Sequence, residues 1–282
     1  MMKKILLILC SLLLLNISTS QSKTRPTCEK SKKTHKCIQP EFLKAGDRVA
    51  LISPSYYSPL EEVQKTAQIL RQWGLEPVIG PNVGKRLNKK YAGSVEERVE
   101  DIRWAMNDPT IKAIICNRGG YGSIHFIDYF SLEELRAHPK WVVGFSDIST
   151  IHGLLTCCSM MSIHGTMGIF LQAGRADDTS IFLRELLKGT IPQYFVPAHP
   201  FNIQGSATGT LVGGNICTFA PNLKSQADAT SKDDIILFIE EVEESMHNID
   251  RQMQILKISS FASDFRPLSR LNLVDRRLAS LL

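Results

Sequence analysis

Two short apolar runs, each ending in a turn that can carry chemistry, most constrain the fold of this chain. Ile111 to Cys116 and Trp141 to Phe145 are rich in β-branched residues and are continuously apolar, which is typical of buried parallel strands. The first run opens into Asn117 to Gly122, whose glycines permit positive φ and let backbone N–H groups approach a ligand. The second opens into Gly144 to Ile148. The pattern predicts an α/β fold with functional turns at its strand ends.

Ser146 lies in the second turn, between a predicted strand and a predicted helix over 150–155. A serine at such a turn exposes its hydroxyl, and the positive end of the helix dipole lies behind it. This is the arrangement of a nucleophile, although Ile148 replaces the second glycine of the usual G-x-S-x-G pattern. A serine that only caps the helix gives the same local pattern.

Strands and helices alternate over the first 165 residues. Further strands are predicted at 47–52, 76–79 and 161–164, and further helices at 59–73, 123–129, 132–137 and 180–187. Another helix begins after Ser94, with Glu97 completing a capping box, and ends before Asp108-Pro109. Such alternation indicates right-handed βαβ units in one parallel sheet. Ser53 to Ser55, the glycine turn and Ser146 are therefore expected to line one crevice at the carboxyl edge.

The composition and the hydrophobic pattern of the sequence change after residue 165. We expect an N-terminal α/β domain over 42–165, and residues 166–204, with polar patches and several prolines, predict an interdomain linker. A smaller, β-rich domain is expected over 205–282. Within it, the pattern predicts a β segment at 205–211, a tight turn at Gly213-Gly214 and a buried strand at 235–239.

Residues 1–20 predict a secretory signal peptide. Two lysines precede an apolar run over 5–15, and Ser18 to Ser20 supply a small-residue cleavage site. The run is too short for a stable membrane span. Cys10 lies inside the run after Leu9, which does not fit an anchoring lipoprotein cysteine. We therefore expect an exported, periplasmic protein.

Residues 21–41 are polar and basic, and predict a flexible tail. This tail distorts the formal net charge of +5: segment 21–40 contributes +5 and the lysines at 3 and 4 contribute +2, leaving residues 41–282 at −2. Such a balance excludes a basic nucleic-acid-binding domain. The sequence has no C-x-x-C pair, so no zinc site is expected.

Five motifs, in order, resemble the LD-carboxypeptidases. They are GGYG at Gly119 to Gly122, PKWVVGFSDIS at Pro139 to Ser149, HGTM at His164 to Met167, GTLVGGN at Gly209 to Asn215 and LFIEEVEE at Leu237 to Glu244. This family comprises serine peptidases that trim murein tetrapeptides, and its relatives include microcin-immunity peptidases. The resemblance implies a flavodoxin-like or amidotransferase-like N-terminal domain, a murein peptide substrate, no metal or organic cofactor, and a homodimer.

The resemblance also implies catalytic roles. Ser146 would be the nucleophile, and the backbone N–H groups of Gly120 and Asp147 would stabilise the oxyanion. Glu240 would orient the histidine base. By sequence alone the glycine turn could equally be a close strand-helix turn, and Glu240 one of several surface acids around it.

Gly119, Tyr121 and His164 match family positions expected to bind substrate. The family's histidine base lies late in the C-terminal domain, but no histidine follows His247 in this sequence, which leaves His164 as the best remaining candidate for a base. Residues 258–282 diverge from the family pattern, as a frameshift or premature stop would produce, so we expect a truncated domain, an absent base and little activity.

The leading interpretation is a periplasmic L,D-carboxypeptidase that removes the terminal D-alanine from murein tetrapeptides. One alternative is a catalytically defective homologue that at most binds murein peptides. Another keeps the hydrolase chemistry but takes a microcin-type antibiotic peptide as substrate.

Overall fold

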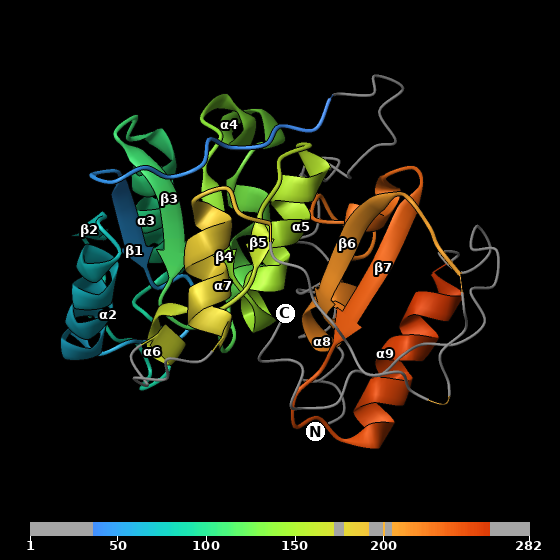
Figure 1. Cartoon of the computed structure of the whole chain (residues 1–282). Coiled ribbons are helices and arrows are strands. Elements are labelled where there is room, and N and C mark those ends of the chain that lie inside the picture. Colours follow the sequence, from blue (N-terminus) through green and yellow to red (C-terminus); the bar gives the residue numbers. More distant parts are fainter. Residues whose placement is uncertain (1–35, 172–177, 192–199, 201–204, 260–282) are drawn as a thin grey trace, which may run out of the picture.

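A computed structural model of the chain describes residues 36–171, 178–191, 200 and 205–259. The predicted signal peptide, most of the predicted basic tail and most of the C-terminal segment predicted to diverge lie outside these residues. The described chain forms two sheets that lie side by side, each with its own helices (Figure 1).

The first sheet has five parallel strands in the order β2-β1-β3-β4-β5. The strands are β1 (Arg48–Ile52), β2 (Glu76–Ile79), β3 (Ile111–Cys116), β4 (Trp141–Gly144) and β5 (Ile163–His164). The predicted parallel sheet is confirmed. Because the strand order reverses between β1 and β3, the carboxyl edge has a topological switch point there, where such folds open a ligand crevice.

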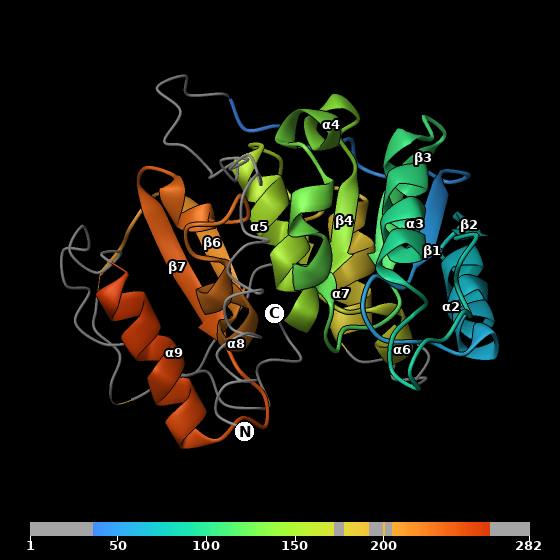
Figure 2. The same cartoon turned by 180° about the vertical axis from the view of Figure 1, so that it is seen from behind.

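Helices cover both faces of this sheet (Figures 1 and 2). One face packs against α2 (Leu60–Gln72), α6 (Gly168–Leu171) and α7 (Asp178–Leu187). The other packs against α3 (Val95–Asn107), the 3-10 helix η1 (Ser123–Tyr129), α4 (Leu132–Ala137), the 3-10 turn η2 (Ser146–Ile148) and α5 (Ser149–Cys157). Burial on both faces explains why the strands are continuously apolar.

The start of α3 shows how local sequence sets an element boundary. The Ser94 hydroxyl accepts from the Glu97 amide at 3.2 Å, and the Glu97 carboxylate accepts from the Ser94 amide at 2.8 Å. This confirms the predicted capping box, which satisfies two of the N–H groups left unpaired at a helix start.

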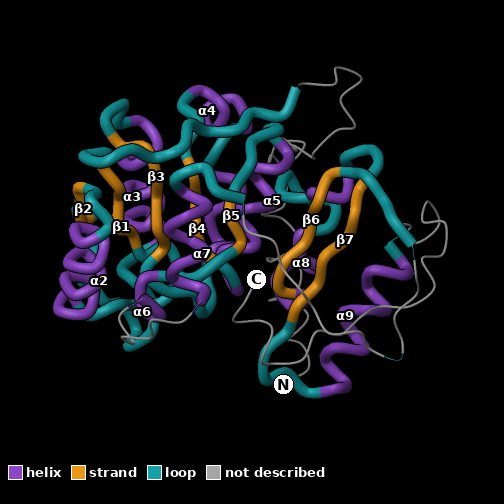
Figure 3. The backbone as a smooth tube through the Cα atoms, viewed as in Figure 1, coloured by secondary structure: helices purple, strands orange, loops and turns teal. Residues whose placement is uncertain are grey.

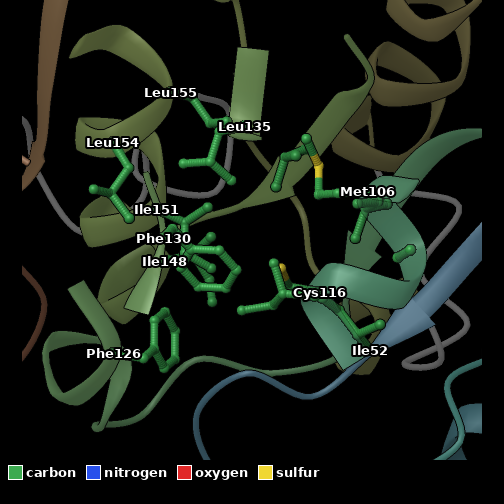
Figure 4. Packing of buried hydrophobic residues seen from close by; sticks show 14 of the residues in the cluster. Ile52, Met106, Cys116, Phe126, Phe130, Leu135, Ile148, Ile151, Leu154 and Leu155 are labelled. Atoms are coloured by element: carbon green, nitrogen blue, oxygen red, sulfur yellow. The ribbon is translucent and has the colours of Figure 1, made fainter. Parts of the chain in front are cut away.

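The core between the sheet and the α3, α5 layer includes Phe126, Ile148 and Leu154, each at most 1% exposed (Figure 4). Ile148 belongs to the turn that carries Ser146, so its burial fixes that turn to the core. A methyl group on Gly144 would lie 2.8 Å from the Ile148 side chain. The approach of Ile148 to the strand end thus requires glycine at 144.

Part of the segment predicted as a linker, 166–204, packs against the first sheet. Leu171, Leu183 and Leu187 are buried against the first sheet, and the Thr66 hydroxyl donates to the Gly168 carbonyl at 3.0 Å. The apolar face of α7 needs this contact, so the first structural unit extends to about Gly189, beyond the predicted boundary at 165.

The second sheet pairs two parallel strands, β6 (Thr210–Asn215) and β7 (Ile235–Glu240) (Figure 3). Around it lie α8 (Ile216–Phe219), the 3-10 turns η3 (Ala220–Asn222) and η4 (Ala229–Ser231), and α9 (Met246–Ile258). A small core including Val212, Ile216 and Leu256 joins these elements. None of the helices in the described ranges is long and apolar enough to cross a membrane.

Gly213 and Gly214 lie inside β6, where the sequence predicts a β segment ending at 211 followed by a tight turn. Their φ angles are +140° and +133°. A methyl group on Gly213 would lie 1.7 Å from the Phe238 carbonyl oxygen, and one on Gly214 would lie 2.3 Å from the Ser149 Oγ. The glycines therefore serve close packing against β7 and α5 and not a chain reversal.

Gly213→Ala should reduce the free energy of unfolding by about 3 kcal/mol or more, because the methyl group meets the Phe238 carbonyl and the φ angle disfavours alanine. Urea unfolding followed by circular dichroism measures this. Gly205→Ala is the matched control, since its methyl group would have no neighbour within 4 Å. Equal stability of the two variants would contradict the packing role of Gly213.

Candidate active site

Ser146 lies at the carboxyl end of β4, half-buried, with a φ of +61°. Positive φ is uncommon for a residue with a side chain and is kept where the surroundings enforce it, which is frequent at functional turns. The core contact of Ile148 on one side and the β4 pairing on the other enforce it here. The turn therefore presents the Ser146 side chain at the carboxyl edge of the sheet.

The glycine turn after β3 lies directly against Ser146. A methyl group on Gly119 would be 3.3 Å from Ser146 Oγ, and one on Gly120, at a φ of +120°, would be 2.3 Å from the Tyr56 ring. Glycine at 119 thus lets the backbone lie close to the serine, and glycine at 120 makes room for the Tyr56 ring at a positive φ. Within the described chain, the Gly120 amide makes no backbone hydrogen bond.

The Asp147 carboxylate connects the ends of three strands. It accepts from the Ser55 hydroxyl at 2.5 Å and from the Ser123 amide at 2.9 Å. The Ser123 hydroxyl donates to the Asp147 carbonyl at 2.5 Å. The loops after β1, β3 and β4 are therefore joined at one buried side chain, and the three predicted turns lie together at the carboxyl edge.

Arg98 supports the same loops from α3. Its guanidinium is buried and donates to the carbonyls of Pro54 and Gly122 at 2.9 Å each. Burial lowers the pKa of Arg98, and the negative charge of Asp147 opposes that shift. The two charges therefore compensate each other inside the wall of the crevice.

The second sheet contributes Glu240, which ends β7 and is 8% exposed. Burial raises the pKa of the Glu240 carboxyl to about 7, the adjacent Glu241 raises it further, and a hydrogen bond with Asn215 opposes both. Asn215 lies opposite Glu240 in the strand register and donates to Glu241 at 3.0 Å. The carboxyl group thus titrates near neutral pH, as groups at functional sites often do.

His164 ends β5 and faces Glu240, with 3.7 Å between its Nε2 and Glu240 Oε1. Burial lowers the pKa of His164 to about 3, and His152 contributes to the shift. His164 also lies opposite Gly144 in the sheet register, two residues before Ser146. The sequence predicts a substrate-binding role for His164, and the structure places it next to the candidate orienting carboxyl group.

Among the residues that the structure describes, no histidine lies within hydrogen-bonding distance of Ser146 Oγ. His152 has both ring nitrogens engaged, with Ser162 Oγ and the Gly144 carbonyl at 2.8 Å each. Three or more His, Cys, Asp or Glu side chains are nowhere gathered as metal ligands within this part of the chain.

Tyr121, predicted to bind substrate, extends outward from the glycine turn and is 47% exposed. It meets the His125 ring edge-on, with ring centroids 5.2 Å apart, and lies 6.5 Å from the Tyr91 ring. Tyr56 in turn meets Tyr91 at 6.0 Å. These rings form an aromatic wall beside the glycine turn, of which sequence reasoning identified only Tyr121.

The contacts between the two sheets were not predicted. The backbone amide of Asn215 donates to Ser149 Oγ at 3.1 Å, and the side-chain amide of Asn222 donates to Thr150 Oγ1 at 3.2 Å. Ser149 and Thr150 form the first turn of α5, directly after Ser146. Asn215 is the last residue of the GTLVGGN motif, and this motif was the one sequence feature that could have indicated its role at this interface.

This arrangement defines the class of protein. The LD-carboxypeptidase N-terminal domain matches residues 49–165, and the C-terminal domain of the same family matches residues 208–268. The chain belongs to the LD-carboxypeptidase family, and it has the α/β fold of that family.

Individual relatives agree with this assignment. A putative carboxypeptidase of Streptomyces coelicolor is 33% identical over 231 residues, which cover 78% of this chain and 73% of the relative. The murein tetrapeptide carboxypeptidase of Pseudomonas aeruginosa is 28% identical over 73% of this chain and 70% of its own length. The crystal structure of a muramoyltetrapeptide carboxypeptidase from Oxalobacter formigenes superposes with a TM-score of 0.66 at 26% identity, covering 76% and 72% of the two chains.

Ser55→Ala should lower the free energy of unfolding by about 2 kcal/mol, because the buried Asp147 carboxylate loses a hydroxyl donor. Chemical denaturation at neutral pH measures the loss. Ser58→Ala is a matched control, since the Ser58 hydroxyl is buried without a hydrogen-bond partner in the described structure. The idea fails if Ser58→Ala is the more damaging substitution.

Glu240→Gln should remove a pH-dependent loss of stability. The folded-state pKa of about 7 lies above the ordinary value of 4.5, so the unfolded chain releases this proton first as pH rises. The free energy of unfolding of the wild type should therefore fall by up to about 3 kcal/mol between about pH 4.5 and about pH 7. This fall should be absent in Glu240→Gln. Unfolding free energies of both proteins at the two pH values measure this, and a constant difference between them would contradict it.

Proposed function

We propose that this carboxypeptidase is a serine-type L,D-carboxypeptidase that removes the terminal D-alanine from murein tetrapeptides. The observation that carries the proposal is the position of Ser146, at a positive-φ turn, with the Gly119 backbone against its hydroxyl. A nucleophile and donors for an oxyanion are then next to each other, as acyl transfer requires.

In this proposal Ser146 Oγ attacks the carbonyl carbon of the L,D amide bond, and the amine of D-alanine leaves with the proton that the serine gave up. A water molecule then hydrolyses the acyl-serine ester, which releases the tripeptide carboxylate and restores the serine hydroxyl. The amides of Gly120 and Asp147 donate to the oxyanion, and one such donor typically contributes about 3 kcal/mol. Glu240 orients the base that takes the serine proton. The late histidine of the family has no counterpart near Ser146 among the described residues up to 259.

The substrate class rests on the relatives. The Pseudomonas aeruginosa protein is a murein tetrapeptide carboxypeptidase, and a relative from Bacillus subtilis, 27% identical over 80% of this chain, is a probable murein peptide carboxypeptidase. Murein tetrapeptide ends in an L,D amide followed by a small D-alanine. The reaction needs neither a redox group nor a metal in the proposed mechanism.

Ser146→Ala should reduce D-alanine release from murein tetrapeptide by about four orders of magnitude or more, because the nucleophile is lost. Mass spectrometry of the tetrapeptide and tripeptide follows the reaction. Ser206→Ala, an exposed serine of the second part of the chain, is the control and should retain full activity. Turnover of an antibiotic peptide but not of murein would contradict the substrate, and a folded wild type without turnover would contradict the reaction.

We also propose that the protein is exported to the periplasm, where murein lies. The two lysines, the apolar run and the small residues of segment 1–20 support this. Fractionation of expressing cells, with N-terminal sequencing of the product, should find a periplasmic chain that begins at about Gln21. A chain that keeps Met1 in the cytosol would contradict export.

A further inference from the structure

His164 and Glu240 come from different sheets and meet where those sheets face each other. β5 ends at His164 and β7 ends at Glu240, and the imidazole Nε2 lies 3.7 Å from the carboxyl Oε1. Their side chains are only 18% and 7% exposed. The two polar groups therefore have little access to solvent and lie on opposite sides of one interface.

Each member of this pair has a buried atom without a hydrogen-bond partner in the described structure. These atoms are His164 Nδ1 and Glu240 Oε1. Buried polar atoms are nearly always paired, so an unpaired one in a native protein calls for a role or a partner. The partner within reach of Glu240 Oε1 is His164 Nε2, because an approach of a few tenths of an ångström would make a hydrogen bond.

Among the residues that the structure describes, the Glu240 carboxyl group lies within ion-pair distance of His164 Nε2, and aromatic rings surround the imidazole. Its ring meets the Phe238 ring edge-on at 4.9 Å and lies 6.1 Å from the Phe145 ring. The nearby His152 ring is 5.9 Å away, but both nitrogens of His152 are occupied by Ser162 and Gly144. His152 is therefore a structural residue, whereas His164 Nε2 remains directed to the carboxyl group.

The ionisable groups around the pair determine its protonation. His152 on α5 is the titratable neighbour of His164. Glu241 follows Glu240 in the chain. On that side, Cys217 on α8 interacts with both Glu241 and Glu244. No cation from these groups faces Glu240 within the described chain, so the donors placed to stabilise its ionised form are the Asn215 side chain and His164 Nε2.

We propose that His164 is a positioning residue that holds the Glu240 carboxyl group at the site through Nε2, and this role rests on the proposed function. When Glu240 is ionised, its carboxylate accepts from Nε2–H. When Glu240 carries the proton, its hydroxyl donates to Nε2 and the imidazole proton lies on Nδ1. Because His164 pairs with the β4 end, the contact ties Glu240 to the strand that presents Ser146.

Nitrogen NMR of the full chain, labelled with ¹⁵N-histidine, tests the pair between about pH 5.5 and about pH 8.5. His164→Gln assigns the signals by their loss. We expect the His164 nitrogens to exchange donor and acceptor character near pH 7, where Glu240 titrates. Glu240→Gln should abolish this exchange, whereas the matched Glu241→Gln should retain it. Identical His164 signals in wild type and Glu240→Gln would overturn the pairing.

Kinetics of D-alanine release test the positioning role. His164→Phe keeps the ring packing against Phe238 but loses Nε2, and should lower kcat about tenfold or more with KM unchanged. His164→Gln, whose amide can replace the Nε2 donor, should recover most of kcat. His138→Phe, at an exposed histidine, controls for the replacement of a histidine by phenylalanine and should leave kcat and KM unchanged.

The results of these two experiments distinguish the positioning role of His164, its pairing with Glu240 and the proposed function from one another. Wild-type kcat in His164→Phe, or a change confined to KM, would overturn the positioning role, and the latter result would return His164 to substrate binding. Absence of D-alanine release from the wild type would overturn the proposed function and the positioning role together. The pairing of His164 with Glu240 would still be decided by the NMR signals.

Discussion

The carboxylate of Asp147 is the contact on which the geometry of the site depends. It holds the Ser55 hydroxyl and the Ser123 amide, and so fixes the loops after β1 and β3 to the turn after β4. Its own backbone follows Ser146 at once, so the side chain that ties the loops together also fixes the serine. Without it, the turn after β4 would lose its hydrogen bonds to the loops after β1 and β3, which Arg98 joins to each other independently.

The site has a second half, which reaches the serine through α5. Ser149 and Thr150 in the first turn of this helix bind Asn215 and Asn222 of the second sheet. At the other end of α5, Lys232 donates to the Cys157 carbonyl at 3.1 Å. The helix behind the nucleophile is thus held at both ends by the part of the chain that supplies Glu240.

The sequence predicted the first sheet well, because its strands and helices differ in hydrophobic period and carry clear capping and stop residues. Ser94 and Glu97 specify the start of α3 locally, and the structure confirms it. The motifs also brought Ser146 and the glycine turn to one crevice. Local signals suffice where neighbours in sequence decide the structure.

Other features depend on partners far away in the sequence. Gly213 and Gly214 have the composition of a turn, but the carbonyl of Phe238 and the hydroxyl of Ser149 are what require glycine there. The contact of His164 with Glu240 joins residues with no shared pattern. The extent of the first unit was missed because α7 is short and lies among polar segments, so only its packing reveals where it belongs.

The dependence of α5 on both sheets also orders the events of folding. Synthesis produces the first sheet and the Ser146 turn before β7, so an emerging chain contains Ser146 before Glu240. Docking of the second sheet brings Glu240 to His164 at the end of β5 and fixes the ends of α5 in the same step. The parts of the candidate site that come from the two sheets are therefore brought together only when the sheets assemble.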